Sequence, residues 1–334
     1  MATRQRRTTI AEVAARAEVS PATVSRVMNG RFVGEAAVAE RVRAAAAELD
    51  YSPSPLARGL ALGTTRTVAF VVPDLANPAF QDILSALSKS AARSGYRVLV
   101  ADSVESPSDE LAIATEIRRR CDAIVLCAPR MPESVLAGAI DDLAPIVLIN
   151  RPGTSANAPM LSIDYLTGIH HLAEHLYSLG HRRLAYVAGP GTSASDQYRR
   201  RGLASFTAEH PDVELVALTG GVSLDDGLAA AARVRDSGVT AALAFNDLVA
   251  IGLVHGLEDL GVTVPDDVSV TGFDDIPFAR YNSPSITTAS VPHEELGIQA
   301  WDRVAALVAG EEPGHSVQFQ PRLELRGSTA APTR

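Results

Sequence analysis

The sequence lacks any apolar run long enough to span a membrane, although 46% of its 334 residues are hydrophobic. A membrane-spanning helix needs about 20 consecutive apolar residues, so we expect no transmembrane segment. The N-terminus is basic, with Arg4, Arg6 and Arg7, but polar residues follow where a secretory signal would have its apolar stretch. We therefore expect a folded protein that stays in the cytoplasm.

Signatures of catalysis are missing as well. The sequence contains no G-x-S-x-G motif, no Walker loop and no strand-linked G-x-G-x-x-G, so hydrolase, NTPase and dehydrogenase functions have no support. Its two cysteines, Cys121 and Cys127, lie on either side of a short apolar run, and we interpret them as reduced thiols in or beside a strand. We expect no enzyme, no cofactor and no metal site.

One sequence pattern is typical of a metal-dependent enzyme. His171-Leu-Ala-Glu-His175 matches the H-x-x-E-H motif of a class of zinc peptidases. A helix over residues 173–179 that ends at Gly180 explains the apolar positions without a metal, and no third ligand is apparent. We favour the helix.

Charge is distributed unevenly along the chain. Residues 1–60 contain nine Arg and six Asp or Glu, which gives +3, and the remainder contains 21 Lys or Arg against 33 acids, which gives −12; the two sum to the net charge of −9. An acidic body is repelled by phosphate, so only the basic N-terminal part is suited to a DNA duplex.

The N-terminal part shows the signals of two short helices. Thr9 followed by Glu12 forms a capping box, and Ser20 followed by Pro21 is a strong helix start. Asn29-Gly30 supplies the second stop. Two helices separated by about three residues predict a helix-turn-helix, although a plain αα-hairpin inside another kind of domain is the alternative.

In a helix-turn-helix the second helix lies in the major groove of DNA. Pro21, Ala22 and Arg26 would then face bases, and Arg26 could bond a guanine twice. Short polar side chains suited to phosphate oxygens surround them: Thr9, Ser20, Thr23, Ser25 and Asn29.

A third helix is predicted over residues 35–49, and a linker rich in proline and glycine follows over 51–63. Leu56, Ala57 and Leu60 have helical spacing in this linker. Such a segment is too short to be a stable helix alone, but it could fold on DNA and insert Leu60 into the minor groove. The alternative is a simple tether.

The motifs Thr-Ile-Ala-Glu-Val-Ala (residues 9–14), Val-Ser-Pro-Ala-Thr-Val-Ser-Arg-Val-Met-Asn-Gly (19–30) and Leu-Asp-Tyr-Ser-Pro-Ser-Pro-Leu-Ala-Arg-Gly-Leu (49–60) resemble the head and hinge of LacI/GalR repressors. The resemblance implies a homodimer on a near-palindromic operator, with Ala57 and Leu60 contacting DNA from the hinge. Gly34 departs from the family, because a Ser or Thr usually caps the third helix there. Gly59 and Ala61 also depart and weaken the expected hinge.

Short apolar runs alternate with helical patterns from residue 68 onward. Buried parallel strands are predicted at 68–72, 98–101, 123–126 and 146–149, with helices at 79–94 and 108–119, and a second set of strands at 184–187, 215–218, 241–245 and 268–272. Two such arrays predict two doubly wound α/β lobes with a ligand cleft between them, and the resemblance implies the same architecture, like that of periplasmic sugar-binding proteins.

These observations divide the chain into three parts. We expect an all-α helix-turn-helix head over residues 1–50, a hinge and linker over 51–65, and an effector-binding and dimerisation body over 66–334. The N-lobe is expected at about 66–163 and 292–318, and the C-lobe at about 164–291 and 319–330.

Ligands of doubly wound folds bind loops at the carboxyl ends of strands. Polar and aromatic side chains stand at those places: Asp74, Asn77, Phe80, Asn150, Arg151, Ser193, Ser195, Arg199, Asn246, Asp247, Asp274 and Asp275. Carboxylates, amides and a guanidinium each hold pairs of hydroxyl groups, which predicts a sugar or sugar derivative. Capping of the next helix is the alternative role for each Asp, Asn or Ser.

The resemblance assigns the effector loops to the segments around Ser193, Ser195, Arg199, Asn246 and Asp274. Ala194 and Val222 replace bulkier residues, so the stacking surface for the ligand is expected to be reduced.

A periplasmic sugar receptor and an enzyme with a regulatory head are the competing functions. Whether the ligand releases DNA or acts as co-repressor stays open, and the missing leucine-heptad tail after Leu325 favours a dimer over a tetramer.

Overall fold

The computed structural model describes residues 8–51, 64–151 and 158–333. It divides into two compact units, Met1–Arg66 and Thr67–Arg334. Among the described residues, none of the helices is both long and apolar enough to cross a membrane.

The first unit contains α1 (Ile10–Arg16), α2 (Pro21–Met28) and α3 (Ala36–Glu48). Both predicted helix starts are confirmed: Thr9 and Glu12 form the reciprocal capping box of α1, and the Ser20 side chain accepts the backbone N–H of Thr23 at the start of α2. The N-cap of α3, Glu35, makes no side-chain cap bond, as the departure at Gly34 implies. A small core of fully buried valines, which includes Val13, Val24 and Val42, joins the three helices.

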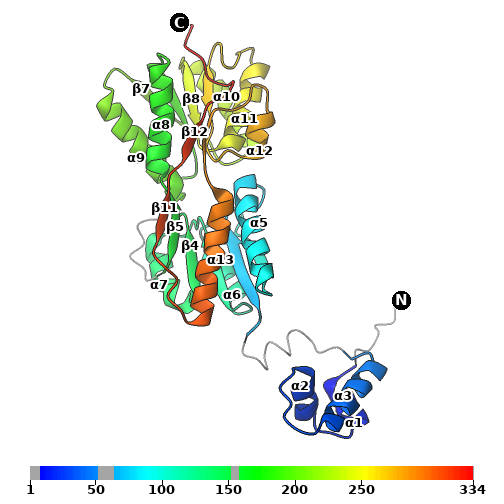
Figure 1. Ribbon diagram of the computed structural model, residues 1–334. Coiled ribbons are helices and arrows are strands. Elements are labelled where there is room, and N and C mark those ends of the chain that lie inside the picture. The colour runs from blue at the N-terminus through cyan, green and yellow to red at the C-terminus, as the bar shows by residue number, and fades with distance from the viewer. Residues whose placement is uncertain (1–7, 52–63, 152–157, 334) are drawn as a thin grey trace. The chain divides into compact units, whose positions relative to one another are not determined.

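The N-lobe of the second unit is built on a six-stranded parallel sheet with the strand order β11-β5-β4-β3-β1-β2 (Figure 1). Its strands are β1 (Thr67–Val72), β2 (Arg97–Asp102), β3 (Ala123–Cys127), β4 (Ile146–Ile149), β5 (Met160–Ile163) and β11 (Val317–Phe319). Alternate side chains of β1 pack on opposite faces, so α5 (Pro78–Arg93) and α13 (His293–Ala309) cover one face and α6 (Glu110–Arg118) and α7 (Glu133–Leu143) the other.

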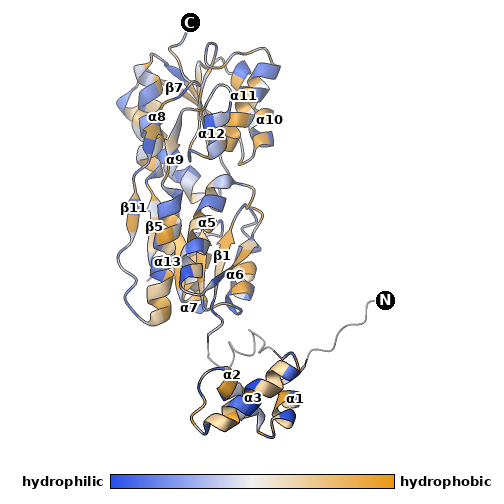
Figure 2. Cartoon of the chain, turned by 45° about the vertical axis from the view of Figure 1, so that its right-hand side comes forward, coloured by the Kyte–Doolittle hydropathy of each residue, from blue (hydrophilic) through white to orange (hydrophobic). Residues whose placement is uncertain are grey.

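The C-lobe has a four-stranded parallel sheet in the order β7-β6-β8-β9. Its elements are β6 (Arg183–Ala188), β7 (Glu214–Thr219), β8 (Ala241–Ala244), β9 (Ser269–Thr271), α8 (Tyr165–Ser178), α9 (Ala194–Glu209), α10 (Leu224–Asp236), α11 (Asp247–Asp259) and α12 (Pro277–Tyr281). On one face of this sheet, Tyr186 packs in a core with side chains of α8 and α9. On the other face, Val187 packs in a core with side chains of α10 and α11. The strands are largely apolar and the outer helix faces largely polar (Figure 2).

The chain passes between the two lobes three times: after β5, after β10 (Thr288–Ser290), and between β11 and β12 (Arg322–Glu324), which pairs with β10. The predicted fold class, a helix-turn-helix head and two doubly wound lobes, is confirmed. Cys121 and Cys127 are free and buried, as expected.

One predicted helix was too short. The helix expected over 173–179 begins at Tyr165, because Asp164 caps it by accepting the N–H and the hydroxyl of Thr167.

Candidate functional site

The head carries one exposed helix face. Pro21, Ala22 and Arg26 are exposed on α2, whereas Val24 and Val27 on its other side are buried. Arg26 Nε donates to the Ala22 carbonyl at 3.3 Å, which leaves the terminal nitrogens of the guanidinium for a ligand. The predicted base-contacting side chains therefore share one surface.

Some of the predicted phosphate-binding side chains already form hydrogen bonds within the head. The Thr9 hydroxyl donates to Glu12 at 3.0 Å, so its proton is already used. Ser20 and Thr23 share one hydroxyl–hydroxyl bond of 3.0 Å, which uses only one of their two protons. Asn29 Nδ2 donates to Ser25 Oγ at 3.3 Å. Ala57 and Leu60 lie outside the described residues.

A cleft lies at the carboxyl ends of the strands, between the two lobes. The empty space in it is about 490 Å³ when the open solvent at its mouth is counted. Its walls come from both lobes: Asp74, Asn77, Ala79, Phe80, Ile83, Glu105, Ala128, Arg130, Asn150, Tyr165, Ser195, Arg199, Val222, Phe245, Asp274 and His293. Seven of the predicted ligand residues therefore meet in one cavity.

Arg199 is the most unusual group in the cleft. It is only 1% exposed, and its guanidinium lies 4.1 to 4.6 Å from the ring centres of Tyr165, Phe245 and Phe273. Within the described part of the chain, Arg199 Nε and Nη1 have no hydrogen-bond partner, and Asn150 Oδ1 also has none. Buried polar groups are nearly always paired, so these atoms indicate a site for a polar ligand.

Asp274 faces Arg199 with a distance of 3.9 Å between Oδ1 and Nη2. Burial raises the pKa of the Asp274 carboxyl to about 7, and the charge of Arg199 opposes this rise. Asp247 lies beneath and accepts hydrogen bonds from the Thr288 hydroxyl and the Ile276 N–H, at 2.6 and 2.8 Å. Burial, and then the charge of Asp274, raise the pKa of Asp247 well above its usual value.

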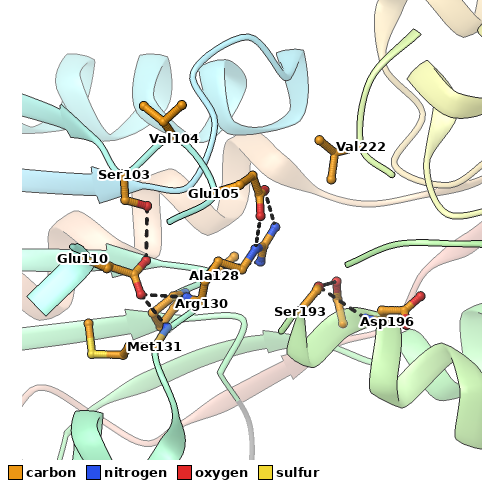
Figure 3. Close-up of polar contacts among 12 residues, drawn as sticks. Ser103, Val104, Glu105, Glu110, Ala128, Arg130, Met131, Ser193, Asp196 and Val222 are labelled. Carbon is orange, nitrogen blue, oxygen red and sulfur yellow. Dashed lines mark hydrogen bonds and ion pairs between the residues drawn. The ribbon is translucent and has the colours of Figure 1, made fainter. Parts of the chain in front are cut away.

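A second polar pair, which the sequence did not reveal, enters the cleft from the N-lobe. Arg130 Nε and Nη2 donate to the two carboxylate oxygens of Glu105, at 2.6 and 2.8 Å, and Nη1 donates to the Ala128 carbonyl at 2.9 Å (Figure 3). The buried Glu110 carboxylate accepts the N–H groups of Arg130 and Met131, both at 2.7 Å. Arg130 is thus held rigidly, and we infer that its position is set before any ligand binds.

Backbone strain is concentrated around this cleft. Of the nine described non-glycine residues with positive φ, six follow strands at the lobe junction: Val104, Glu105, Ala128, Asn150, Asp274 and Asp275. A β-branched residue such as Val104, at φ 49°, seldom adopts this region. Strained conformations collect at binding sites because the surrounding structure holds them for function.

Five of the twelve predicted ligand residues do not line the cavity: Arg151, Ser193, Asn246, Asp247 and Asp275. Ser193 is the N-cap of α9 and accepts the Asp196 N–H, and Asn246 is the N-cap of α11 and accepts the Val249 N–H. The side chains of Ser193 and Asn246 therefore both cap helices, which is the alternative role considered for them. Ser193 still reaches the cleft indirectly, because its hydroxyl is bonded to that of Ser195 at 2.8 Å.

Sequence reasoning missed several lining residues besides Arg130 and Glu105. Tyr165 and Phe245 supply aromatic surface, and His293 lies at the second lobe crossing. Burial lowers the pKa of His293 to about 4, so this imidazole is neutral at physiological pH. Phe245 could have been found, since it is the last residue of a predicted strand, whereas Tyr165 and His293 begin helices that were not predicted there.

The sequence matches two protein families. Residues 9–54 match the bacterial regulatory proteins of the lacI family, and residues 173–329 match the periplasmic binding protein-like domain. The chain is 33% identical to the HTH-type transcriptional regulator GalR of Salmonella typhimurium over 97% of each chain. It is 29% identical to the transcriptional repressor CytR of Escherichia coli over 97% of this chain and 96% of the relative.

Solved structures agree. A lac repressor dimer bound to operator and the anti-inducer ONPF superposes with a TM-score of 0.83 at 26% identity, over 98% of this chain and all of that one. The regulator CelR in complex with cellobiose superposes with a TM-score of 0.70 at 26% identity, over 96% and 100% of the two chains. The protein therefore belongs to the LacI/GalR family of DNA-binding transcriptional regulators, which are not enzymes.

Proposed function

We propose that the protein is a homodimeric repressor that acts in the cytoplasm on a near-palindromic operator and is controlled by a carbohydrate in the cleft. Residues 1–50 would bind the major groove, residues 51–65 the minor groove, and residues 66–334 the effector and the second subunit. The single observation that carries the effector site is the buried Arg199 guanidinium with two nitrogens that no described residue satisfies.

The donors and acceptors in the cleft match neighbouring hydroxyl groups. A guanidinium offers two parallel N–H groups, and the Asp274 carboxylate and the Asn150 amide oxygen accept hydrogen bonds. Phe80, Tyr165 and Phe245 line the same cavity and offer apolar surface to a sugar ring. Cellobiose is named as the ligand of CelR, one of the similar structures, and this supports a carbohydrate here.

Ligand panels test the effector class. Thermal unfolding of the full chain is measured with monosaccharides, disaccharides, sugar phosphates and nucleosides, and hits are retested for their effect on operator binding. We expect a carbohydrate hit that Arg199→Gln abolishes while circular dichroism and DNA affinity stay intact. A response to nucleosides alone, or a sugar response that survives Arg199→Gln, contradicts the proposal. The sign of the effect on DNA separates an inducer from a co-repressor.

The DNA-binding half has its own test. Selection of fragments from a genomic library should recover a palindromic sequence, and the protein should bind it at least about 1,000-fold more tightly than random DNA. Equal affinity for both would contradict the proposal.

An apolar surface supports the homodimer. Phe278, Tyr281 and Leu224 are 60%, 81% and 45% exposed, and they line one groove together with Ala76, Pro78, Leu248, Ile251 and Asn282. Exposed apolar patches of this kind mark protein interfaces, and the similar lac repressor structure is described as a dimer. We assign the groove to a second copy of this chain.

The oligomeric state tests this assignment. Light scattering should give a dimer for the parent and a monomer for Phe278→Asp/Tyr281→Asp, whose operator affinity should also collapse because each half-site is then bound alone. Leu325→Asp, at a residue that is 60% exposed elsewhere, is the control and should remain dimeric. A tetrameric parent, or a dimeric double variant, contradicts the assignment.

A further inference from the structure

Three side chains with metal-binding atoms meet where α8 and α9 of the C-lobe pack together, and none of them lines the cleft. His170, Glu174 and Glu209 offer one ligand atom each, and all three atoms lie within 4.8 Å of one another. His170 Nε2 is 3.4 Å from a Glu209 carboxylate oxygen. His210 does not belong to this group of three, but its Nε2 lies 2.6 Å from Glu174 Oε1.

The packing of two helices brings these residues together. His170 and Glu174 are four residues apart on α8 and therefore share one face, whereas Glu209 and His210 stand at the C-terminal end of α9. The two helices approach closely at Gly202, where a Cβ atom would lie only 2.4 Å from the Leu166 carbonyl oxygen. The cluster is thus fixed by tertiary structure and not by neighbours in sequence.

Aromatic packing orients both imidazole rings. Phe206 is fully buried between the helices, and the His170 ring meets it edge-on at 5.9 Å while the His210 ring lies against it at 4.8 Å. Tyr177 packs against the His210 ring as well, at 4.0 Å. The orientation of each imidazole ring is therefore set by ring packing.

The chemistry of the donor set selects a class of ion. Imidazole nitrogen together with carboxylate oxygen suits Zn²⁺ and similar transition metals, whereas Ca²⁺ and Mg²⁺ prefer oxygen alone. In a tetrahedral zinc site with bonds of about 2.0 to 2.1 Å, the donors lie roughly 3.3 Å apart. The His170–Glu209 pair already has this separation, and the Glu174 side chain, which is 38% exposed, has room to move.

We propose that His170, Glu174 and Glu209 bind a Zn²⁺-class dication that fastens α8 to the end of α9, beside the hydrogen bond between His210 and Glu174. The site differs from the H-x-x-E-H pattern in sequence. His171 is exposed, and His175 Nε2 is bonded to the Thr329 hydroxyl at 3.1 Å, so only Glu174 of that pattern takes part. Three protein ligands leave one position of a tetrahedral site for a water molecule, and none of the three residues lines the cleft.

Titration of the full chain tests the site. After metals are removed with a chelator, calorimetry with ZnCl₂ should show one equivalent bound per chain, MgCl₂ should show none, and Zn²⁺ should raise the unfolding temperature. Co²⁺ should give the visible absorption of tetrahedral coordination, a signal that ion pairs alone cannot produce. Glu209→Gln and His170→Gln should each weaken Zn²⁺ binding at least tenfold.

A matched control uses another His–Glu pair on the surface. His255 Nδ1 lies 3.7 Å from Glu258, and this pair is not among the groups of three or more metal-binding side chains found in the described residues. Glu258→Gln should leave Zn²⁺ binding unchanged. Equal weakening by Glu258→Gln, a Zn²⁺ affinity untouched by both site variants, or equal affinity for Mg²⁺ overturns the proposal and leaves His170–Glu209 and His210–Glu174 as simple ion pairs.

Discussion

The head and the cleft differ in the exposure and the hydrogen bonding of their polar side chains. In the head, Thr9 and Ser20 are exposed and bond to groups three residues away. In the cleft, Arg199 and Asn150 are buried, and some of their polar atoms have no partner among the described residues. The caps of the head are therefore formed before it meets DNA, and the one unpaired buried side-chain atom among the described residues 8–51 is Asn29 Oδ1, whereas the cleft has several donors and acceptors that a ligand could satisfy.

This difference determines what each region contributes to stability. A satisfied, capped helix stabilises the folded chain by itself, but buried unpaired groups cost free energy. A ligand that satisfies them stabilises the folded body in proportion to its affinity and concentration. The unpaired groups of the cleft thus lower the stability of the free protein and are available to bind a ligand. Substitutions in the head should therefore change DNA binding, and substitutions in the cleft should change effector binding.

The largest expected effect concerns the carboxyl of Asp274. Its pKa is raised from 3.8 to about 7 in the folded state, so between these two pKa values the folded protein keeps a proton that the unfolded chain releases. The contribution of this group to stability is fully present below the unfolded pKa and is lost as the pH rises through the folded pKa. An asparagine side chain cannot titrate, so Asp274→Asn should gain up to about 4 kcal/mol over the parent across this interval.

Urea unfolding at a series of pH values from mildly acidic to mildly basic, followed by the fluorescence of Trp301, the only tryptophan, measures this difference. His293 titrates in the opposite sense, because burial lowers its pKa, but it is present in both proteins and cancels. Asp259→Asn, at an exposed carboxyl at the end of α11, should show no such trend. A difference that stays constant with pH would mean that Asp274 is not buried as a neutral group.

The next effect is on effector affinity. Asp274→Ala removes an acceptor beside Arg199, and the loss of a hydrogen bond to a charged group costs about 1.5 to 3 kcal/mol, or roughly 10- to 150-fold in affinity. Operator binding in the absence of effector should remain normal, because Asp274 belongs to the unit Thr67–Arg334. Fluorescence anisotropy with labelled operator measures both. Loss of DNA binding in this variant would break the separation between head and cleft.

Arg26→Ala is the counterpart in the head. An arginine that bonds a guanine twice contributes about 1 to 3 kcal/mol of discrimination between bases, so the variant should bind operator and single-base variants of it almost equally at one position. Effector binding, measured by the thermal shift of the body, should be unchanged. Uniform weakening on all DNA would instead indicate that Arg26 contacts only phosphate.

The same difference explains what the sequence could predict. The helices of the head follow from local signals, since a capping box and a Ser-Pro start act within four residues. The strands beside the cleft were also predictable as apolar runs, and the polar residues that follow them reach the cavity because parallel strands end at one edge.

Contacts between distant segments could not be predicted. Glu105 and Arg130 are 25 residues apart, and neither has a local pattern that pairs them. Capping also competes with ligand binding for the same residue types, so Ser193 and Asn246 could not be separated from Ser195 by composition alone. The start of α8, by contrast, could have been found, because Asp164 is a strong cap residue and the buried Tyr165, Gly168, Ile169 and Leu172 that follow have helical spacing.

The smallest effect compares two serine caps directly. Ser20 begins α2 in the head and Ser193 begins α9 at the cleft, and each accepts the N–H three residues on. Either substitution by alanine should cost about 1 kcal/mol of stability. Ser20→Ala should weaken DNA binding and leave the effector response intact. Ser193→Ala should also weaken effector binding slightly, because its hydroxyl holds that of Ser195, which lines the cleft. If Ser193→Ala changes stability alone, Ser193 is a cap and not a ligand residue, and the hydroxyl of Ser195 binds effector without help from its neighbour.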